Sequence, residues 1–191
     1  HDRRDAPDRT WHARPGPNGL LATDPRMPIL SLRATTQDHH AKLLPHVDRL
    51  LDLAGMIGQV DCSAIHDTFD EEYAFVVGQL VPHIEAIETT LYGQLEQLLG
   101  RRHSMAPMRQ EHVVMRQLIE ELGGYRRHAE RCSWDTAEGL ALRRALYRLH
   151  SILKVHLAEE ELYLAVLDRN LSDEEKDLLA RGIDHAMAEP L

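Results

Sequence analysis

The sequence predicts an all-α protein: an antiparallel up-down-up-down four-helix bundle with an irregular N-terminal segment and a short C-terminal helix. Three observations lead to this prediction. Apolar residues recur with helical spacing over most of the chain after about residue 35. No segment shows the apolar–polar alternation that is typical of a strand. Four long periodic segments follow one another with short connections, which is the pattern of an antiparallel bundle.

The helices are bounded by recognisable end signals. The long helices are expected at residues 35–57, 68–99, 104–131 and 136–168. Thr68-Phe-Asp-Glu71 and Ser172-Asp-Glu-Glu175 both match the capping box that begins a helix, so we expect helices to start at both points. Pro45 and Pro82 lie inside the first two helices, each close before a histidine, and a proline there removes one helical hydrogen bond and kinks the helix.

These signals divide the chain into three parts. Residues 1–34 are rich in proline and glycine and have no helical period, so we expect a flexible or draped segment. Residues 35–170 form the predicted bundle, and residues 171–191 form the C-terminal helix and tail. The first segment has neither an apolar stretch typical of a signal peptide nor an initiating methionine, which favours a truncated or processed start.

Composition excludes several classes of partner. The chain has 191 residues and a net charge of −9, so a nucleic-acid partner, which needs a basic face, is not expected. No apolar run is long enough to span a membrane. The two cysteines, Cys62 and Cys132, lie far apart in the sequence, which excludes a thiolate metal site and favours a reducing, cytoplasmic location.

The histidines are the unusual feature of the composition, because there are 13 of them. At 100° per residue, each long helix directs one histidine into its apolar stripe. These residues are His40, His83, His112 and His156, and Glu160 lies one turn after the last of them. Burying four imidazoles and a carboxylate without partners would cost several kcal/mol each, whereas one metal site supplies a partner to all of them. Histidine with carboxylate suits Fe, Mn or Zn better than Ca or Mg.

The motifs around these residues resemble a known family, the hemerythrin-like (HHE cation-binding) domains, over about residues 35–170. The motifs are Asp38-His39-His40 in the first helix, Pro82-His83 with Glu88 and Leu91-Tyr92 in the second, Glu111-His112 in the third, and His156-Leu-Ala-Glu-Glu160-Glu161 in the fourth. Two longer strings resemble actinobacterial members in particular, namely Leu43-Leu-Pro-His46 and Ala145-Leu-Tyr-Arg-Leu-His150.

The resemblance implies a non-haem di-iron centre with a bridging oxygen and one position open to O2, peroxide or NO. The residues that match the family's histidine ligands are His40, His83, His112 and His156. Glu160 matches a carboxylate ligand, and Glu161, one position further on, is a second candidate. Manganese or zinc are alternative metals.

The chain departs from the family pattern at two positions. Ile87 stands where the second helix would carry a glutamate, and Glu88 is the candidate replacement if the kink at Pro82 turns it inward. Met108 stands where many members have a further histidine, and a thioether suits packing better than ferric iron. Two histidines that flank the first helix's stripe, His39 and His46, could fill the vacancies. A pair of metals, a single metal and an empty site all fit the pattern.

Two functions from different classes follow. The first is an iron protein that binds, senses or turns over a small oxidant, because an apolar lining favours diatomic or peroxide ligands over large organic substrates. The pattern does not distinguish binding from turnover. Tyr92 is expected to pack in the core, with hydrogen bonding of its hydroxyl to a metal-bound ligand as the alternative. The alternative is a regulatory or scaffolding bundle with a degenerate metal site, acting through a protein partner that the sequence does not identify.

Overall fold

The structure is a computed structural model that describes residues 32–100, 104–129 and 135–188, and within them it is all-α, as predicted. The helices are α1 (Leu32–Met56), α2 (Cys62–Phe75), α3 (Val81–Leu99), α4 (Ala106–Ala129), α5 (Thr136–Asn170) and α6 (Asp173–Ala188). A π-helical turn, η1 (Val76–Leu80), joins α2 to α3. Most of the expected N-terminal segment lies outside the described residues, but residues 32–34 already belong to α1.

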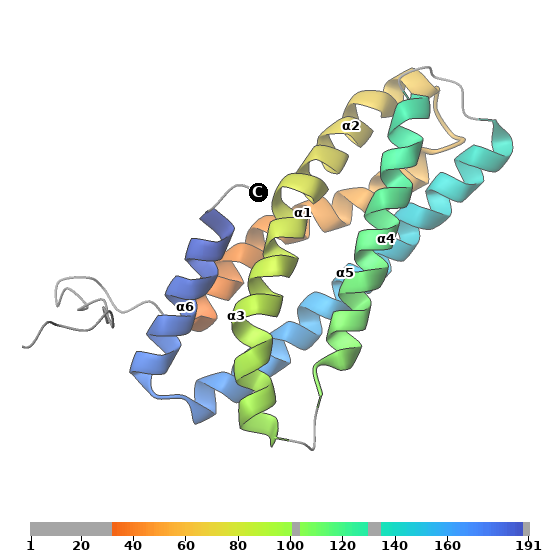
Figure 1. The fold of residues 1–191 in the computed structure, drawn as a ribbon. Helices are drawn as coiled ribbons and strands as arrows, with labels where there is room; N and C mark the ends of the chain where they lie inside the picture. The colour runs from red at the N-terminus through yellow and green to blue at the C-terminus, as the bar shows by residue number, and fades with distance from the viewer. Residues whose placement is uncertain (1–31, 101–103, 130–134, 189–191) are drawn as a thin grey trace, which may run out of the picture.

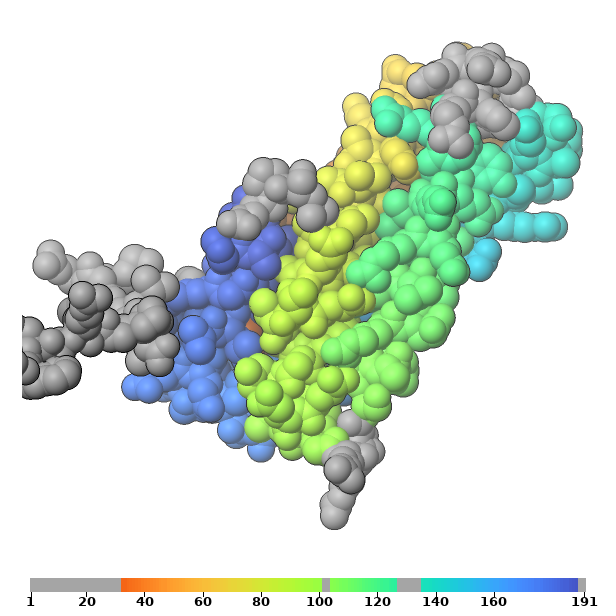
Figure 2. Space-filling model, viewed as in Figure 1, coloured from red at the N-terminus to blue at the C-terminus, as the bar shows by residue number. Residues whose placement is uncertain are grey.

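The four rods of the bundle are α1, the continuous α2–η1–α3, α4 and α5 (Figure 1). Successive rods run in opposite directions, and α5 packs most extensively on α1 and α4. The C-terminal helix α6 packs against α1 and α3 at one end of the bundle. In Figure 2, α3 and α4 form the face toward the viewer, with α6 beside α3. None of the described helices is long and apolar enough to cross a membrane.

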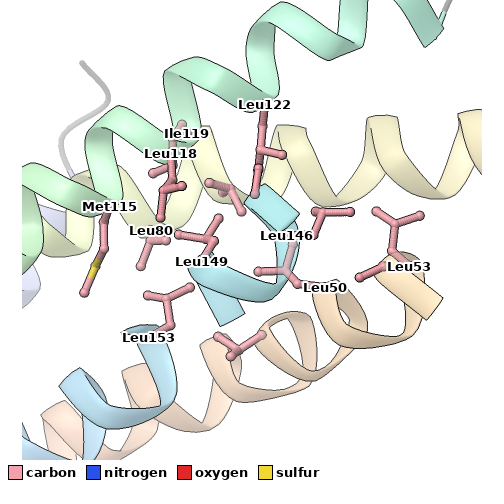
Figure 3. Packing of buried hydrophobic residues seen from close by; sticks show 14 of the residues in the cluster. Leu50, Leu53, Leu80, Met115, Leu118, Ile119, Leu122, Leu146, Leu149 and Leu153 are labelled. Atoms are coloured by element: carbon pink, nitrogen blue, oxygen red, sulfur yellow. The ribbon is translucent and has the colours of Figure 1, made fainter. Parts of the chain in front are cut away.

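The buried apolar side chains form two clusters along the bundle. The larger one, the major core, joins α1, α2, η1, the start of α3, α4 and α5, and Figure 3 shows part of it, including Leu50, Leu80, Met115, Leu146 and Leu149. The smaller one, the minor core, joins α3, α5 and α6 to the beginnings of α1 and α4, and includes Leu32, Ile87, Met108, Leu164 and Ile183. Both clusters are built from side chains at helical spacing, because only one stripe of each helix faces its neighbours.

One predicted helix start is wrong. Thr68 does not cap a helix, because α2 begins at Cys62 and Thr68 lies inside it. Ile65 and Phe69 lie one turn apart and are both buried in the major core, so packing extends the helix upstream of the expected loop boundary. The N-cap position is occupied by Asp61.

Two other predicted helix starts, at residue 136 and after Ser172, are confirmed. Asp135 and Glu138 form the two reciprocal bonds of a capping box at the start of α5. At the start of α6, the Glu175 backbone N–H donates to the Ser172 hydroxyl at 3.3 Å, and the Ser172 backbone N–H donates to the Glu175 carboxylate at 2.8 Å. Both pairs satisfy backbone groups that a helix terminus leaves without a partner.

The two internal prolines are accommodated differently. Pro82 lies at the start of α3, directly after the π-helical turn, where the backbone N–H of Val81 bonds to the carbonyl of Val76, five residues back. Pro82 has no backbone N–H to donate, and the wider π-helical turn before it accommodates the missing helical hydrogen bond. Pro45 lies within α1, which is α-helical throughout. The irregularity expected near Pro82 is therefore present, immediately before His83.

Candidate metal centre

Five buried polar side chains from four helices meet where the major core gives way to the minor core. They come from α1, α3, α4 and, for the last two, α5, and none is more than 3% exposed: His40, His83, His112, His156 and Glu160. These are the five residues that the sequence directs into the bundle. We call them the polar cluster.

Glu160 lies at the centre of this cluster and faces a pair of histidines with each of its oxygens. Its Oε2 lies 3.0 Å from Nε2 of His40 and 3.4 Å from Nε2 of His83. Its Oε1 lies 3.3 Å from Nε2 of His156. His112 completes the second pair, with its Nε2 2.8 Å from Nε2 of His156. A carboxylate whose two oxygens face two imidazole pairs has the arrangement of a bridging ligand between two metal ions.

The contact between His112 and His156 indicates that a cation fits here. The Nδ1 atoms of both rings are already bonded to carboxylates, His112 to Glu88 and His156 to Glu111, each at 2.7 Å. When both Nδ1–H groups donate outward, two Nε2 lone pairs face each other, and only a shared proton or a metal ion makes that favourable.

His83 gives a second indication. Its side chain is 1% exposed, and among the described residues neither ring nitrogen has a hydrogen-bond partner. An unsatisfied buried polar group costs about 1–3 kcal/mol. A metal ion between His40, His83 and Glu160 would give one of the two nitrogens a partner, and the ligand atoms of these three residues lie within 4.8 Å of one another. The same separation holds for His112, His156 and Glu160.

The surroundings of the polar cluster favour an ionised Glu160 and shift the pKa values of the second histidine pair in opposite directions. Burial alone would raise the pKa of Glu160, but hydrogen bonds from His156 and His40 and the nearby His83 ring hold that pKa well below its usual value. Burial, together with the neighbouring His156, lowers the pKa of His112 to about 4. Burial also opposes charge on His156, yet hydrogen bonds and charge from Glu160 and Glu111 raise its pKa. In this pair the pKa of His156 is therefore raised while that of His112 is lowered.

Tyr92 is both a packing residue, as the sequence favoured, and a polar contributor, which the sequence left as the alternative. It is fully buried, as expected, but its hydroxyl lies 3.3 Å from both Glu160 Oε1 and His112 Nε2. Burial and the charge of Glu160 raise the pKa of Tyr92, so the hydroxyl stays protonated and can donate to the carboxylate. The signal available in the sequence was an inward-facing hydroxyl on the same helix as His83.

Two carboxylates that the sequence offers as metal ligands, Glu88 and Glu161, lie on the outer side of the histidine rings. They do not face the interior of the polar cluster. Glu88 accepts from Nδ1 of His112 and is paired with Arg116, whose Nη2 lies 3.2 Å from its Oε2. Burial opposes the charge of Glu88, but hydrogen bonds from Arg116 and His112 lower its pKa. The Oε1 of Glu161 lies 3.5 Å from Nδ1 of His40, on the outer side of that ring.

The two flanking histidine candidates are engaged elsewhere. The Nδ1 of His46 lies 2.9 Å from the buried carboxylate of Glu72, and its ring stacks on Phe75 with a centroid separation of 3.4 Å. The Nε2 of His39 lies 3.2 Å from Asp184 on α6. The structure brings neither ring into the two groups around Glu160.

The two departures from the family pattern are both apolar packing positions. Ile87 and Met108 are buried in the minor core, at 0% and 1% exposed. At these two positions the side chains pack against apolar neighbours, whereas the family pattern has residues that would supply metal-ligand atoms. The carboxylate expected on the second helix is therefore absent from the inward-facing set.

Comparison with protein families agrees with this geometry. The hemerythrin HHE cation-binding domain model matches residues 32–180. The match covers well over half of the chain, and the protein therefore belongs to the hemerythrin HHE family. No curated protein and no solved structure matches the chain significantly.

Proposed function

We propose that this hemerythrin-family protein holds two iron ions at the polar cluster and uses them to bind, sense or turn over a small oxidant such as O2, peroxide or NO. The observation that carries the proposal is the position of Glu160, whose two oxygens face separate imidazole pairs. The donor set of imidazoles and a carboxylate also suits manganese or zinc.

The residues divide into two metal positions. His40 and His83 would hold one ion with Oε2 of Glu160, and we call this the first position. His112 and His156 would hold the other with Oε1 of Glu160, and we call this the second position. Iron bound there supplies redox chemistry and a coordination site for a small ligand.

The chain's own groups orient these ligands and control access. Glu88 and Glu111 hold the Nδ1 protons of His112 and His156 on the outer side, so both Nε2 atoms face inward. The hydroxyl of Tyr92 is the neutral donor on the inner side, beside Glu160. Because the five residues of the polar cluster are at most 3% exposed, diatomic molecules or peroxide fit the site better than a large organic substrate.

Metal analysis with absorption spectroscopy tests the proposal. Protein produced with iron in the medium is expected to contain about two iron ions per chain and to show near-ultraviolet ligand-to-iron bands that change on addition of O2, peroxide or NO. His156→Ala is expected to lose most of the metal, because this ring lies at the centre of the second group. His185→Ala, on the exposed side of α6, is the control and is expected to keep it.

A colourless, metal-free protein whose unfolding temperature ignores added Fe(II), Mn(II) and Zn(II) would contradict the proposal, since a ligand of the native state must stabilise it. That result would favour the regulatory or scaffolding function. Equal metal content in the two variants would show that α5 does not supply this ligand to the site.

A further inference from the structure

We infer that the two metal positions are unequal: the second position, at His112 and His156, binds its ion more tightly and fills first, because Glu88 and Glu111 strengthen its two imidazoles. This inference rests on the proposed function and deepens it. It predicts a stable form of the protein that holds one metal ion, at His112 and His156.

The second position has a short carboxylate contact behind each imidazole. Glu88 and Glu111 each lie 2.7 Å from the Nδ1 atom of their histidine. Arg116 fixes Glu88 by contacting both of its oxygens, at 3.3 and 3.2 Å. These carboxylates are about a quarter exposed, so they lie between the buried rings and the surface.

The first position lacks such support. In the described part of the chain, the carboxylate that contacts Nδ1 of His40 is that of Glu161, at 3.5 Å, and this side chain is 38% exposed. Glu161 also accepts a 3.4 Å hydrogen bond from Gln37. Among the described residues, Nδ1 of His83 has no hydrogen-bond partner at all.

The difference matters because the group behind a ligating imidazole sets its basicity. A carboxylate that accepts the Nδ1 proton makes Nε2 a stronger donor to the metal and fixes the ring's orientation, and loss of such a partner costs about 10–100-fold in metal affinity. Glu160 contributes one oxygen to each position, so its charge does not distinguish them. The outer carboxylates therefore decide the order of filling.

The two outer carboxylates should not contribute equally. The charge of Glu88 is partly balanced by Arg116, whereas Glu111 has no cationic side chain other than His156 paired with it among the described residues. A less compensated carboxylate polarises its imidazole more strongly. Removing the charge of Glu111 is expected to weaken the second position more than removing that of Glu88.

Stepwise addition of Co(II) to chelator-treated protein tests the inference, with bound metal measured by equilibrium dialysis and visible Co(II) absorption. The wild-type chain is expected to bind in two steps with different spectra. His156→Ala should remove the tight step, and His83→Ala should remove only the weak one. Glu111→Gln should weaken the tight step by about 10–100-fold, and Glu88→Gln by less. Glu120→Gln, on the exposed side of α4, is the matched control and should change neither step.

Each outcome has a defined meaning. Two equal steps in the wild-type protein, or an equal effect of Glu111→Gln on both steps, would overturn the inference while leaving the metal centre in place. Absence of any Co(II) binding would instead overturn the proposed function and this inference with it. The glutamine variants replace a charged acceptor by a neutral one of nearly the same size. They therefore test the role of the charge even if a histidine variant fails to fold.

Discussion

The major core and the polar cluster are equally buried but are built from opposite materials. Around Leu149 and Leu146, both 0% exposed, the bundle interior is a cluster of apolar side chains. Around Glu160, also 0% exposed, it is a carboxylate surrounded by imidazoles and a phenol. The first region is stable from apolar burial alone, whereas the second needs every polar atom to find a partner. The contrast indicates that the polar cluster has a function other than holding the helices together.

The place in the bundle where apolar packing gives way to the polar cluster supports this interpretation. His83, near the start of α3, follows Leu80 of the major core and precedes Ile84 of the major core and Ile87 of the minor core. On α4, His112 lies between Met108 of the minor core and Met115 of the major core. The polar cluster thus replaces one layer of an otherwise continuous apolar interior, with apolar packing on both sides to exclude water.

The largest effect is expected from a change to the apolar region. Leu149→Ala should lower the free energy of unfolding by about 2–5 kcal/mol, because the truncation leaves a cavity in a fully buried cluster. Denaturant unfolding measures this change, and Leu140→Ala, at a position 46% exposed on the same helix, is the control. The metal content of folded Leu149→Ala should be unchanged. A parallel loss of metal would show that the two regions do not act independently.

The second largest effect on stability is expected from a substitution at the centre of the polar cluster. Glu160→Gln keeps the size of the side chain but removes the charge that faces both imidazole pairs, so both metal positions should be lost. In the metal-free protein we expect a loss of about 1–3 kcal/mol, because a neutral amide is a weaker partner for the buried imidazoles. Metal analysis with chemical denaturation measures both quantities. Glu159→Gln is the neighbouring control, and retention of full metal content by Glu160→Gln would contradict a bridging role.

A smaller effect is expected from Tyr92→Phe. This change keeps the buried ring but removes the hydroxyl next to Glu160 and His112, with an expected loss of about 0.5–1.5 kcal/mol in stability. Because the hydroxyl lies beside the second position, the visible spectrum of the first Co(II) to bind should shift. A spectrum identical to that of the wild-type protein would assign Tyr92 to packing alone.

The smallest effect is expected at the surface, away from both regions. The hydrogen bond from Arg126 is the main cause that lowers the pKa of Asp70, and Asp70 is 39% exposed. A lowered carboxyl pKa stabilises the fold above the unfolded-state value near 4, and the contribution disappears as pH falls through the folded-state pKa. Asp70→Asn should therefore cost less than about 1 kcal/mol at pH 7 and nothing at acidic pH. Unfolding at both pH values measures this, and a loss of the same size at both would assign the cost to packing.

The sequence was sufficient to predict the direction of the inward histidines, because side-chain direction follows helical periodicity. His40, His83, His112 and His156 therefore converge as expected, and their role as ligands stays a prediction. The uses of other polar groups depend on partners from distant helices. Glu88 contacts a histidine 24 residues away on α4, and no pattern within α3 indicates this.

Two local features of the helices, the start of α2 and the form of the irregular turn before Pro82, were also not predicted from the sequence. The start of α2 was missed because Ile65 and Phe69 gain burial only when α1 and α4 are in place. The proline at position 82 predicted an irregular helix, but the form of the irregularity, a π-helical turn from Val76 to Leu80, depends on packing on both sides of it.

The most direct test of the metal centre is the unfolding temperature of the chelator-treated protein as a function of added Fe(II) under anaerobic conditions, for the wild type and for Glu160→Gln. The wild-type temperature should rise with Fe(II) concentration, with a gain of about 2.7 kcal/mol at a hundred times the dissociation constant. The temperature of the variant should stay constant. A wild-type unfolding temperature that does not respond to Fe(II), or a variant that responds equally, would contradict a metal centre bridged by Glu160.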